Sequence, residues 1–290
     1  MLRACWSSDH LQSFFRNFDV IVVDRSACGE STESKYNKMK KLVTFRTIVI
    51  WGFFFFTAAS IILQSVTEYN KYFVAGITNP FPHGYIPVTI FFVSLQVWEI
   101  GAWLFPILYQ VTLFKFLCSG FTSLNNDISK MIEDNSKKIK DIRGKHLQLC
   151  KTVAILEEDS KYLLTGTYVT NIFLLCFIVY QMLTSGTLPV IEYLTYSSWL
   201  AMNALITIIV SLTAAEVNEK AHSPLDYIYD VDMSETCAFQ SVELQMFLFK
   251  LNGPAVGFTT MGFVTITKEL ILTLGGIILT YFLLLIQFKL

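Results

Sequence analysis

The chain has 290 residues, of which 53% are hydrophobic, 15% aromatic and only 16% charged, and its formal net charge is −1. Soluble domains carry about 25% charged residues, so the composition indicates a membrane protein, and the near-zero net charge gives no reason to expect a nucleic-acid partner. The six cysteines are scattered without a paired CxxC spacing, which supports neither a zinc site nor a disulfide framework. No cofactor and no metal are therefore expected.

Five apolar runs are long enough to cross a bilayer, which takes about 20 residues in a helix. In chain order they cover about residues 47–66, 86–117, 162–183, 193–215 and 270–288. A spanning segment must satisfy its own backbone hydrogen bonds, and the chain lacks the short alternating strands of a β-barrel. The expected fold is all-α: a polytopic membrane helix bundle of five spans, with residues 1–43 as an amino-terminal segment and residues 44–290 as a transmembrane domain.

The second run is longer than one crossing. As a helix, residues 86–117 would measure about 48 Å, against about 30 Å for the hydrocarbon core, so this helix should project beyond the bilayer. We expect a break around residues 119–122 and then a second helix over 124–164, which would extend the third span outside the membrane. The charges at 133–145 are interpreted as a solvated face of that helix.

A further helix outside the bilayer is expected in the loop 216–257. After a turn at Ser223-Pro224, apolar residues recur at helical spacing. They are Phe239, Val242, Met246 and Phe249. Gly253-Pro254 would end this helix. Together with the projecting helices it would form a compact helical anchor layer beneath the membrane.

The basic residues are distributed unevenly between the two sides of the membrane. Segments 1–43, 118–161 and 216–257 lie on one side if all five runs span, and they contain seven, eight and two Lys and Arg residues. The other side contains only Lys71 and Lys289. Because basic residues favour the cytoplasm, the amino end is predicted to be cytoplasmic and the carboxyl end extracellular. G-protein-coupled receptors have seven spans and the reverse orientation, so this topology disfavours that class.

The last run carries a polar stripe. Residues 270–288 contain no charge, yet Thr273, Thr280 and Gln287 recur every seven residues, with Gly276 between the first two. In a helix these positions share one face. A polar stripe on a spanning helix should face protein or water rather than lipid. Two interpretations remain open: one wall of a conduction pathway, or a seam of small and polar residues between helices.

The same run ends on a motif with a fixed order of residues. Thr280-Tyr281 is followed by five apolar residues at 282–286 and then by Gln287-Phe288, two residues from the end. This order resembles the signature that closes insect gustatory receptors. Looser likenesses to that family precede the last helix and the third span, and the likeness extends over roughly residues 40–290. The residues leading into the last helix are Gly262-Phe263 with Val264, Ile266 and Leu270. Those before the third span are His146, Leu149, Cys150 and Val153.

The resemblance implies a subunit of a ligand-gated cation channel. Members of this family have seven spans and the orientation predicted above, lie in the plasma membrane, and assemble as homo- or heterotetramers around a pore lined by the last helix. It further implies that Gln287 and Phe288 form the gate, with Thr280, Tyr281 and Thr273 lower on the same helix. A ring of amides replaces part of the hydration of an ion, and an apolar ring blocks by dewetting. A small-molecule tastant would open the pore to monovalent cations, with calcium as a further candidate.

A ligand pocket is expected in the outer halves of the second, third and fourth runs, where aromatic side chains with a few polar groups suit a small organic molecule. The candidates are Phe92, Gln96, Glu99, Tyr180 and Trp199. A carboxylate inside a span is costly unless it has a partner or lines a wet cavity, so Glu99 is the strongest candidate among these residues. The alternative is that the aromatic residues are core, lipid-facing or interfacial, and that Glu99 forms a structural hydrogen bond.

The sequence also departs from the seven-span pattern, because its five runs align with the third to seventh spans. A truncated, non-conducting accessory or degenerate receptor is therefore an alternative to the channel. A secondary transporter is a further alternative, but no inverted repeat or pair of broken helices supports it. The four histidines are dispersed, and the sequence has no HExxH, GxSxG or P-loop motif, so an enzyme is not expected.

Overall fold

The computed structural model describes scattered positions between residues 41 and 59 and the ranges 85–133, 139–184, 190–229 and 238–289. The amino-terminal segment 1–43 and the first predicted span, 47–66, fall mostly outside these residues. The positions described there, such as Trp51 and Phe55, are helical.

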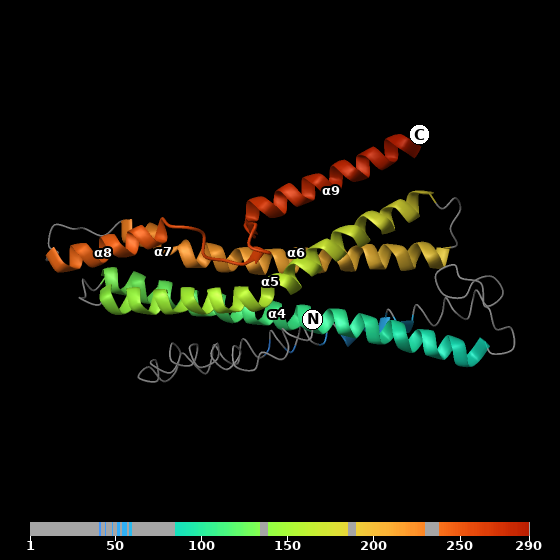
Figure 1. Ribbon diagram of the computed structural model, residues 1–290, viewed down its shortest axis with the longest axis horizontal. Coiled ribbons are helices and arrows are strands. Elements are labelled where there is room, and N and C mark those ends of the chain that lie inside the picture. Colours follow the sequence, from blue (N-terminus) through green and yellow to red (C-terminus); the bar gives the residue numbers. More distant parts are fainter. Residues whose placement is uncertain are drawn as a thin grey trace.

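Three long helices form the body of the molecule: α4 (Tyr85–Glu133), α5 (Ile139–Thr184) and α6 (Val190–His222). Figure 1 shows α4 and α6 running in one direction and α5 in the other. The 49 residues of α4 extend for about 74 Å, more than twice the thickness of the hydrocarbon core. The long helices therefore have room for a membrane span and a projection beyond it, as the second and third apolar runs predicted.

The predicted break at residues 119–122 is wrong, because α4 continues through it without interruption. Residues 124–133 therefore belong to α4, and the helix expected over 124–164 begins at Ile139 as α5. Leu117, Phe121 and Leu124 are at most 2% exposed and extend one buried stripe along the helix. The Thr122 hydroxyl donates a hydrogen bond to the Cys118 carbonyl within the same helix, at 2.8 Å. The low helix propensity of Ser119-Gly120 is a weak preference, and burial of this stripe overrides it.

One end of the bundle forms a compact layer with two shorter helices, α7 (Pro224–Tyr229) and α8 (Ala238–Leu251). We call this layer the base, and it also contains α4 from Lys115, α5 as far as Ser160 and α6 from Ala214. In Figure 1 the base lies at the left. Helix α8 ends just before Gly253-Pro254, where the sequence predicted its end. The fully buried side chains of the base include Phe121, Leu149 and Phe247.

The carboxyl end of α6 lies at the centre of the base. Carbonyl groups in the last turn of a helix lack partners within the helix, and here side chains from the two neighbouring helices supply them. Asn125 on α4 donates its side-chain amide to the Lys220 carbonyl at 3.1 Å. The buried His146 on α5 donates from Nε2 to the Ala221 carbonyl at 3.0 Å. All three long helices are thereby fixed at one point.

The last residue of α6 continues this network toward the carboxyl-terminal part of the chain. His222 Nε2 accepts a hydrogen bond from the backbone amide of Val256 at 3.0 Å, so Nδ1 is the nitrogen that donates to the Leu251 carbonyl at 2.8 Å. Asn218, one turn earlier, donates to the Val256 carbonyl at 3.1 Å. The segment after α8 is therefore attached to α6 by side-chain bonds to its backbone.

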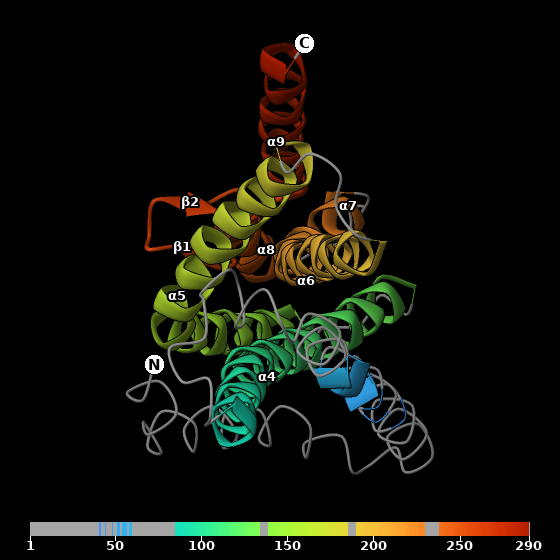
Figure 2. The same cartoon turned by 90° about the vertical axis from the view of Figure 1, so that its right-hand side faces the viewer.

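A small hairpin follows and leads into the last helix. β1 (Thr259–Thr260) pairs antiparallel with β2 (Val264–Thr265), and the turn between them places Met261 and Gly262 at positive φ, 50° and 79°. Figure 2 shows the hairpin beside α5. The last helix, α9 (Lys268–Lys289), begins three residues after β2.

The hairpin is anchored to the body by the residue that precedes it. Phe258 is fully buried, and its ring stacks on Phe114 of α4 with 3.9 Å between centroids. Ile266, on the other side of the hairpin, is also fully buried. The start of α9 is thus fixed to the bundle by apolar packing on both sides of the turn.

Four of the described helical segments are long and apolar enough to cross a membrane. They are Val97–Ser129, Ile139–Thr184, Glu192–Ile228 and Lys268–Gln287. Each of them overlaps one of the last four apolar runs in the sequence. The arrangement is a helical membrane bundle with a packed base at one end.

Candidate functional site

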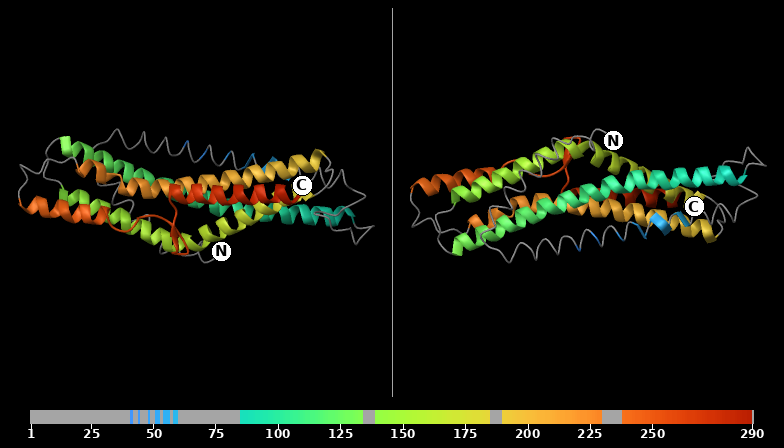
Figure 3. Two further views of the ribbon diagram at one scale, coloured as in Figure 1. Left: turned by 90° about the horizontal axis from the view of Figure 1, so that it is seen from above. Right: turned by 90° about the horizontal axis from the view of Figure 1, so that it is seen from below.

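Helix α9 is covered by its own chain only in part. Leu270 and Leu274 pack against the buried core near the start of the helix, and α9 contacts α5 and α6. Beyond these turns α9 diverges from the body, as Figures 1 and 2 show, while the view from above in Figure 3 places it over α6. None of the residues in its most apolar stretch is buried. α9 is therefore a span-length helix with most of its surface unpaired.

The polar stripe predicted on α9 lies on the uncovered part of this surface. Seven positions of α9 are half-buried, and most of them gather on one face: Leu270, Ile271, Leu274, Ile278, Tyr281, Leu285 and Ile286. Thr273, Thr280 and Gln287 are exposed. At about 100° per residue, the stripe lies roughly 120° around the helix from the less exposed face. The stripe therefore faces away from the chain to which it belongs.

The structure separates the residues predicted for the gate into two faces. Gln287 lies on the exposed stripe, whereas Tyr281 lies on the half-buried face of α9 that is turned toward the body. The backbone of Phe288 belongs to α9, and its side chain lies outside the described residues. Tyr281 therefore shares a face with Leu270 and Leu274 and not with the stripe, and its role in a gate stays a prediction.

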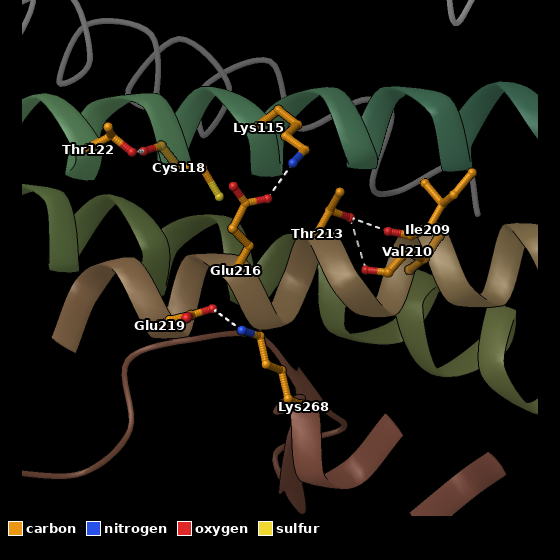
Figure 4. A network of polar contacts seen from close by, with 9 residues as sticks. All are labelled: Lys115, Cys118, Thr122, Ile209, Val210, Thr213, Glu216, Glu219 and Lys268. Carbon is orange, nitrogen blue, oxygen red and sulfur yellow. Dashed lines mark hydrogen bonds and ion pairs between the residues drawn. The ribbon is translucent and has the colours of Figure 1, made fainter. Parts of the chain in front are cut away.

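Two ion pairs on one stretch of α6 attach this helix to α4 and to the start of α9. Glu216 on α6 pairs with Lys115 on α4, and Glu219, one turn further, pairs with Lys268, the first residue of α9, with 2.7 Å between Nζ and Oε2. Figure 4 shows both pairs along one stretch of α6. Helix α6 thereby connects the long helix α4 to the root of α9.

The residues predicted to line a ligand pocket are distributed over α4, α5 and α6. Glu99 is exposed on α4, Tyr180 is 46% exposed on α5 and Trp199 is half-buried on α6. The backbones of Phe92 and Gln96 lie in α4, and their side chains are outside the described residues. No hydrogen bond or ion pair joins the three described side chains to one another. Their role in a pocket stays a prediction.

Comparison with known proteins identifies the family. The sequence profile described as 7tm chemosensory receptor matches residues 1–290. The chain belongs to this family. Among similar proteins, gustatory receptor for sugar taste 64a of Drosophila melanogaster is 24% identical over 190 residues, which are 64% of this chain and 40% of that protein. High-energy light unresponsive protein 1 of Caenorhabditis elegans is 21% identical over 178 residues, 60% of this chain and 40% of that protein.

The fold of this chemosensory receptor is also found in solved structures. The insect olfactory receptor OR5 from Machilis hrabei superposes with a TM-score of 0.69 over 96% of this chain and 80% of that chain, at 16% identity. Its complex with eugenol gives 0.67 over 99% of this chain and 82% of that chain, also at 16% identity. The predicted all-α membrane bundle and the predicted family are therefore confirmed. The alignments to the curated relatives named above span 40% of those proteins.

Sequence reasoning did not single out the polar groups inside the receptor's bundle. The Tyr168 and Ser211 hydroxyls share a hydrogen bond of 2.6 Å, and Asn171 donates to the Thr207 hydroxyl at 3.0 Å. Gln110 on α4 is only 2% exposed, and neither of its amide atoms has a partner among the described residues. Polar residues at helical spacing within apolar runs are the signal that would have indicated such positions.

The described residues contain no group of three or more His, Cys, Asp or Glu side chains that could hold a metal ion. Cys118 and Cys150 are buried and Cys176 is half-buried, and all three are free thiols.

Proposed function

We propose that this receptor is a subunit of a ligand-gated cation channel that a small-molecule tastant opens. The observation that carries the proposal is the exposed polar stripe of α9. A span-length helix whose polar face is turned away from its own chain requires a polar surrounding, since lipid would leave that face without partners. Copies of α9 around a shared, water-filled axis supply that surrounding.

The base supports assembly into a homo- or heterotetramer. Helix α8 buries Leu244 and Phe247 against its own chain. Its other face exposes Val242, Met246 and Phe249 by 50%, 54% and 84%. An apolar face outside the membrane is typical of a contact between protein chains. Subunits joined through α8 would hold their α9 helices at a fixed distance from the axis.

In such an assembly Gln287 would line the outer constriction, and Phe288 would close it. The amide oxygen replaces part of the hydration shell of a monovalent cation or of calcium, and a ring of Phe side chains blocks conduction by dewetting. Ligand binding would favour the open arrangement by contacting it better than the closed one. The outer parts of α4, α5 and α6, with Glu99, Tyr180 and Trp199, are the proposed ligand site.

The orientation follows from the basic residues. The base contains most of the described Lys and Arg side chains, including Lys140, Arg143 and Lys145, so it would lie in the cytoplasm. The carboxyl end of α9 would then be extracellular, in the plasma membrane.

Calcium imaging in a cultured cell line tests the proposal. The chain would be expressed with and without Gln287→Ala, and the cells exposed to sucrose, maltose, glucose, fructose and eugenol, because these represent the ligands in the names of similar proteins. We expect ligand-evoked calcium entry that Gln287→Ala changes in size or in selectivity.

Leu279→Ala is the matched control, because Leu279 is 58% exposed on α9 but lies roughly 80° around the helix from Gln287. It should leave the response unchanged. Protein that reaches the cell surface without forming tetramers would instead support the accessory receptor.

A further inference from the structure

The exposed stripe of α9 continues one turn further toward the base than the uncharged run in the sequence indicates. Helix α9 begins at Lys268, so Glu269 belongs to its first turn. Glu269 precedes Thr273 by four residues and Thr280 by eleven, the spacing of one helix face, and all three are exposed. The stripe therefore begins with the Glu269 carboxylate at the end nearest the base and ends at Gln287.

The lysine next to Glu269 is held on another side of the helix. Lys268 Nζ lies 2.7 Å from the Glu219 carboxylate on α6 of the same chain, as Figure 4 shows. Successive residues in a helix are separated by about 100°, so this ion pair keeps the positive charge away from the stripe. The Glu269 carboxylate forms no ion pair or hydrogen bond with any other described residue. The stripe therefore carries an uncompensated negative charge at this end.

The hydroxyl groups of the stripe have the polarity that suits a cation. Thr273 donates its hydroxyl proton to the Glu269 carbonyl at 3.0 Å, and Thr280 donates to the Gly276 carbonyl at 2.8 Å. A hydroxyl has one proton and two lone pairs, so the proton of each is used within the helix and only acceptor lone pairs remain for a ligand. From Glu269 to Thr280 the stripe thus presents oxygen acceptors, which bind cations and not anions.

We propose that Glu269 forms, in the assembled channel, a ring of carboxylates at the base end of the pore that concentrates cations and excludes anions. This inference rests on the proposed function, and it adds the residue that sets charge selectivity at the cytoplasmic mouth. Charge of one sign in a narrow aqueous mouth raises the local concentration of counter-ions and their rate of arrival. Each subunit contributes one carboxylate. The Glu219–Lys268 ion pair fixes the orientation of the first turn of α9, which carries this carboxylate.

Patch-clamp recording of Glu269→Gln tests the role in conduction, with the ligand panel named above as the activator. A charge at the cytoplasmic mouth acts most strongly on ions that enter from inside. We expect outward single-channel current to fall about twofold or more relative to inward current, and calcium permeability relative to sodium to fall. Glu269→Lys should enlarge both effects. Unchanged rectification and selectivity in both variants would overturn the inference.

Glu158→Gln is the matched control for loss of one carboxylate. Glu158 is exposed on α5, and its carboxylate pairs with Lys161 of the same helix at 2.5 Å. This variant should leave rectification unchanged. If Gln287→Ala alters the current and Glu269→Gln does not, the inference fails while the proposed channel stands.

Cysteine cross-linking in isolated membranes needs no ligand. We would compare Glu269→Cys with Ile271→Cys, because the two positions are two residues apart but lie roughly 160° apart around the helix. A bifunctional maleimide about 10 Å long should join subunits at position 269 in preference to 271. Equal cross-linking at both positions, or none at 269, would overturn the inference. Absence of cross-linking at 269 and at Thr273→Cys, together with absence of current, would count against the channel itself.

Discussion

The base and α9 differ in how completely the chain satisfies its own side chains. In the base, Phe121, Leu149 and Phe247 are at most 2% exposed, and the end of α6 finds hydrogen-bond partners on α4 and α5. In α9, Leu272 is 77% exposed, and the polar stripe faces away from the body. The difference teaches that the interior of the base is packed within one chain, whereas α9 depends on its surroundings along most of its length. Four sets of variants would break or sharpen this contrast.

Removing a large side chain from the base should have the largest effect. Phe121→Ala deletes a fully buried ring and should lower the free energy of unfolding by about 3–5 kcal/mol. Leu272→Ala on α9 should change it by less than about 0.5 kcal/mol. Thermal unfolding of the detergent-solubilised protein, followed by tryptophan fluorescence, measures both. Equal losses would show that α9 is packed as tightly as the base.

Loss of the hydrogen bond from His146 to the carboxyl end of α6 should have the second-largest effect on stability. His146→Leu removes the donor to the buried Ala221 carbonyl, and an unpaired buried polar group costs about 1–3 kcal/mol. The same unfolding measurement should show this loss. His146→Gln, which retains a donor, should recover part of the stability. Equal destabilisation by both variants would mean that ring packing, and not the hydrogen bond, holds the end of α6.

Replacing the unpaired amide inside the bundle should raise the free energy of unfolding, whereas the two changes above lower it. Gln110→Leu removes two buried atoms that have no partner among the described residues, and it should raise the free energy of unfolding by about 1 kcal/mol. Gln245→Leu, at an exposed position of α8, is the control and should be close to neutral. A clear loss of stability in Gln110→Leu would reveal that water or a ligand binds the amide.

The ion pair at the root of α9 should have the smallest effect. The Lys268 and Glu219 side chains are 64% and 55% exposed, so solvent screens their attraction, and exposed pairs contribute about 0.2–1 kcal/mol. A double-mutant cycle with Lys268→Gln and Glu219→Gln should give a coupling in this range that decreases in concentrated salt. A coupling well above it would indicate that the pair is buried in the assembled receptor.

The periodic features of the fold could be predicted from the sequence because each depends on neighbouring residues. The last four spans follow from the length of their apolar runs, the end of α8 from Gly253-Pro254, and the stripe of Thr273, Thr280 and Gln287 from helical spacing. The terminal motif that starts at Thr280-Tyr281 indicated the family, and the match over residues 1–290 confirmed it. The uninterrupted course of α4 could not be predicted, since burial against other helices overrides the weak preference of Ser119-Gly120.

The predicted site likewise has features that follow from local sequence and features that only tertiary packing sets. The sequence indicated which residues form the stripe, but only the structure shows that Tyr281 lies on the other face and that Glu269 extends the stripe. The first of these depends on where the body of the chain lies relative to α9. The second depends on where the helix begins, and the hairpin anchored by Phe258 and Ile266 decides that.

By itself the sequence determined that this is a helical membrane protein of the chemosensory receptor family, because hydrophobic length and a short terminal motif are local properties. The tertiary structure alone decided which face of each helix is covered and which remains open. It also decided that Lys268 is held against α6 while Glu269 is left on the stripe. Residues far apart in the sequence set these contacts through packing and charge, and no periodicity along one helix contains that information.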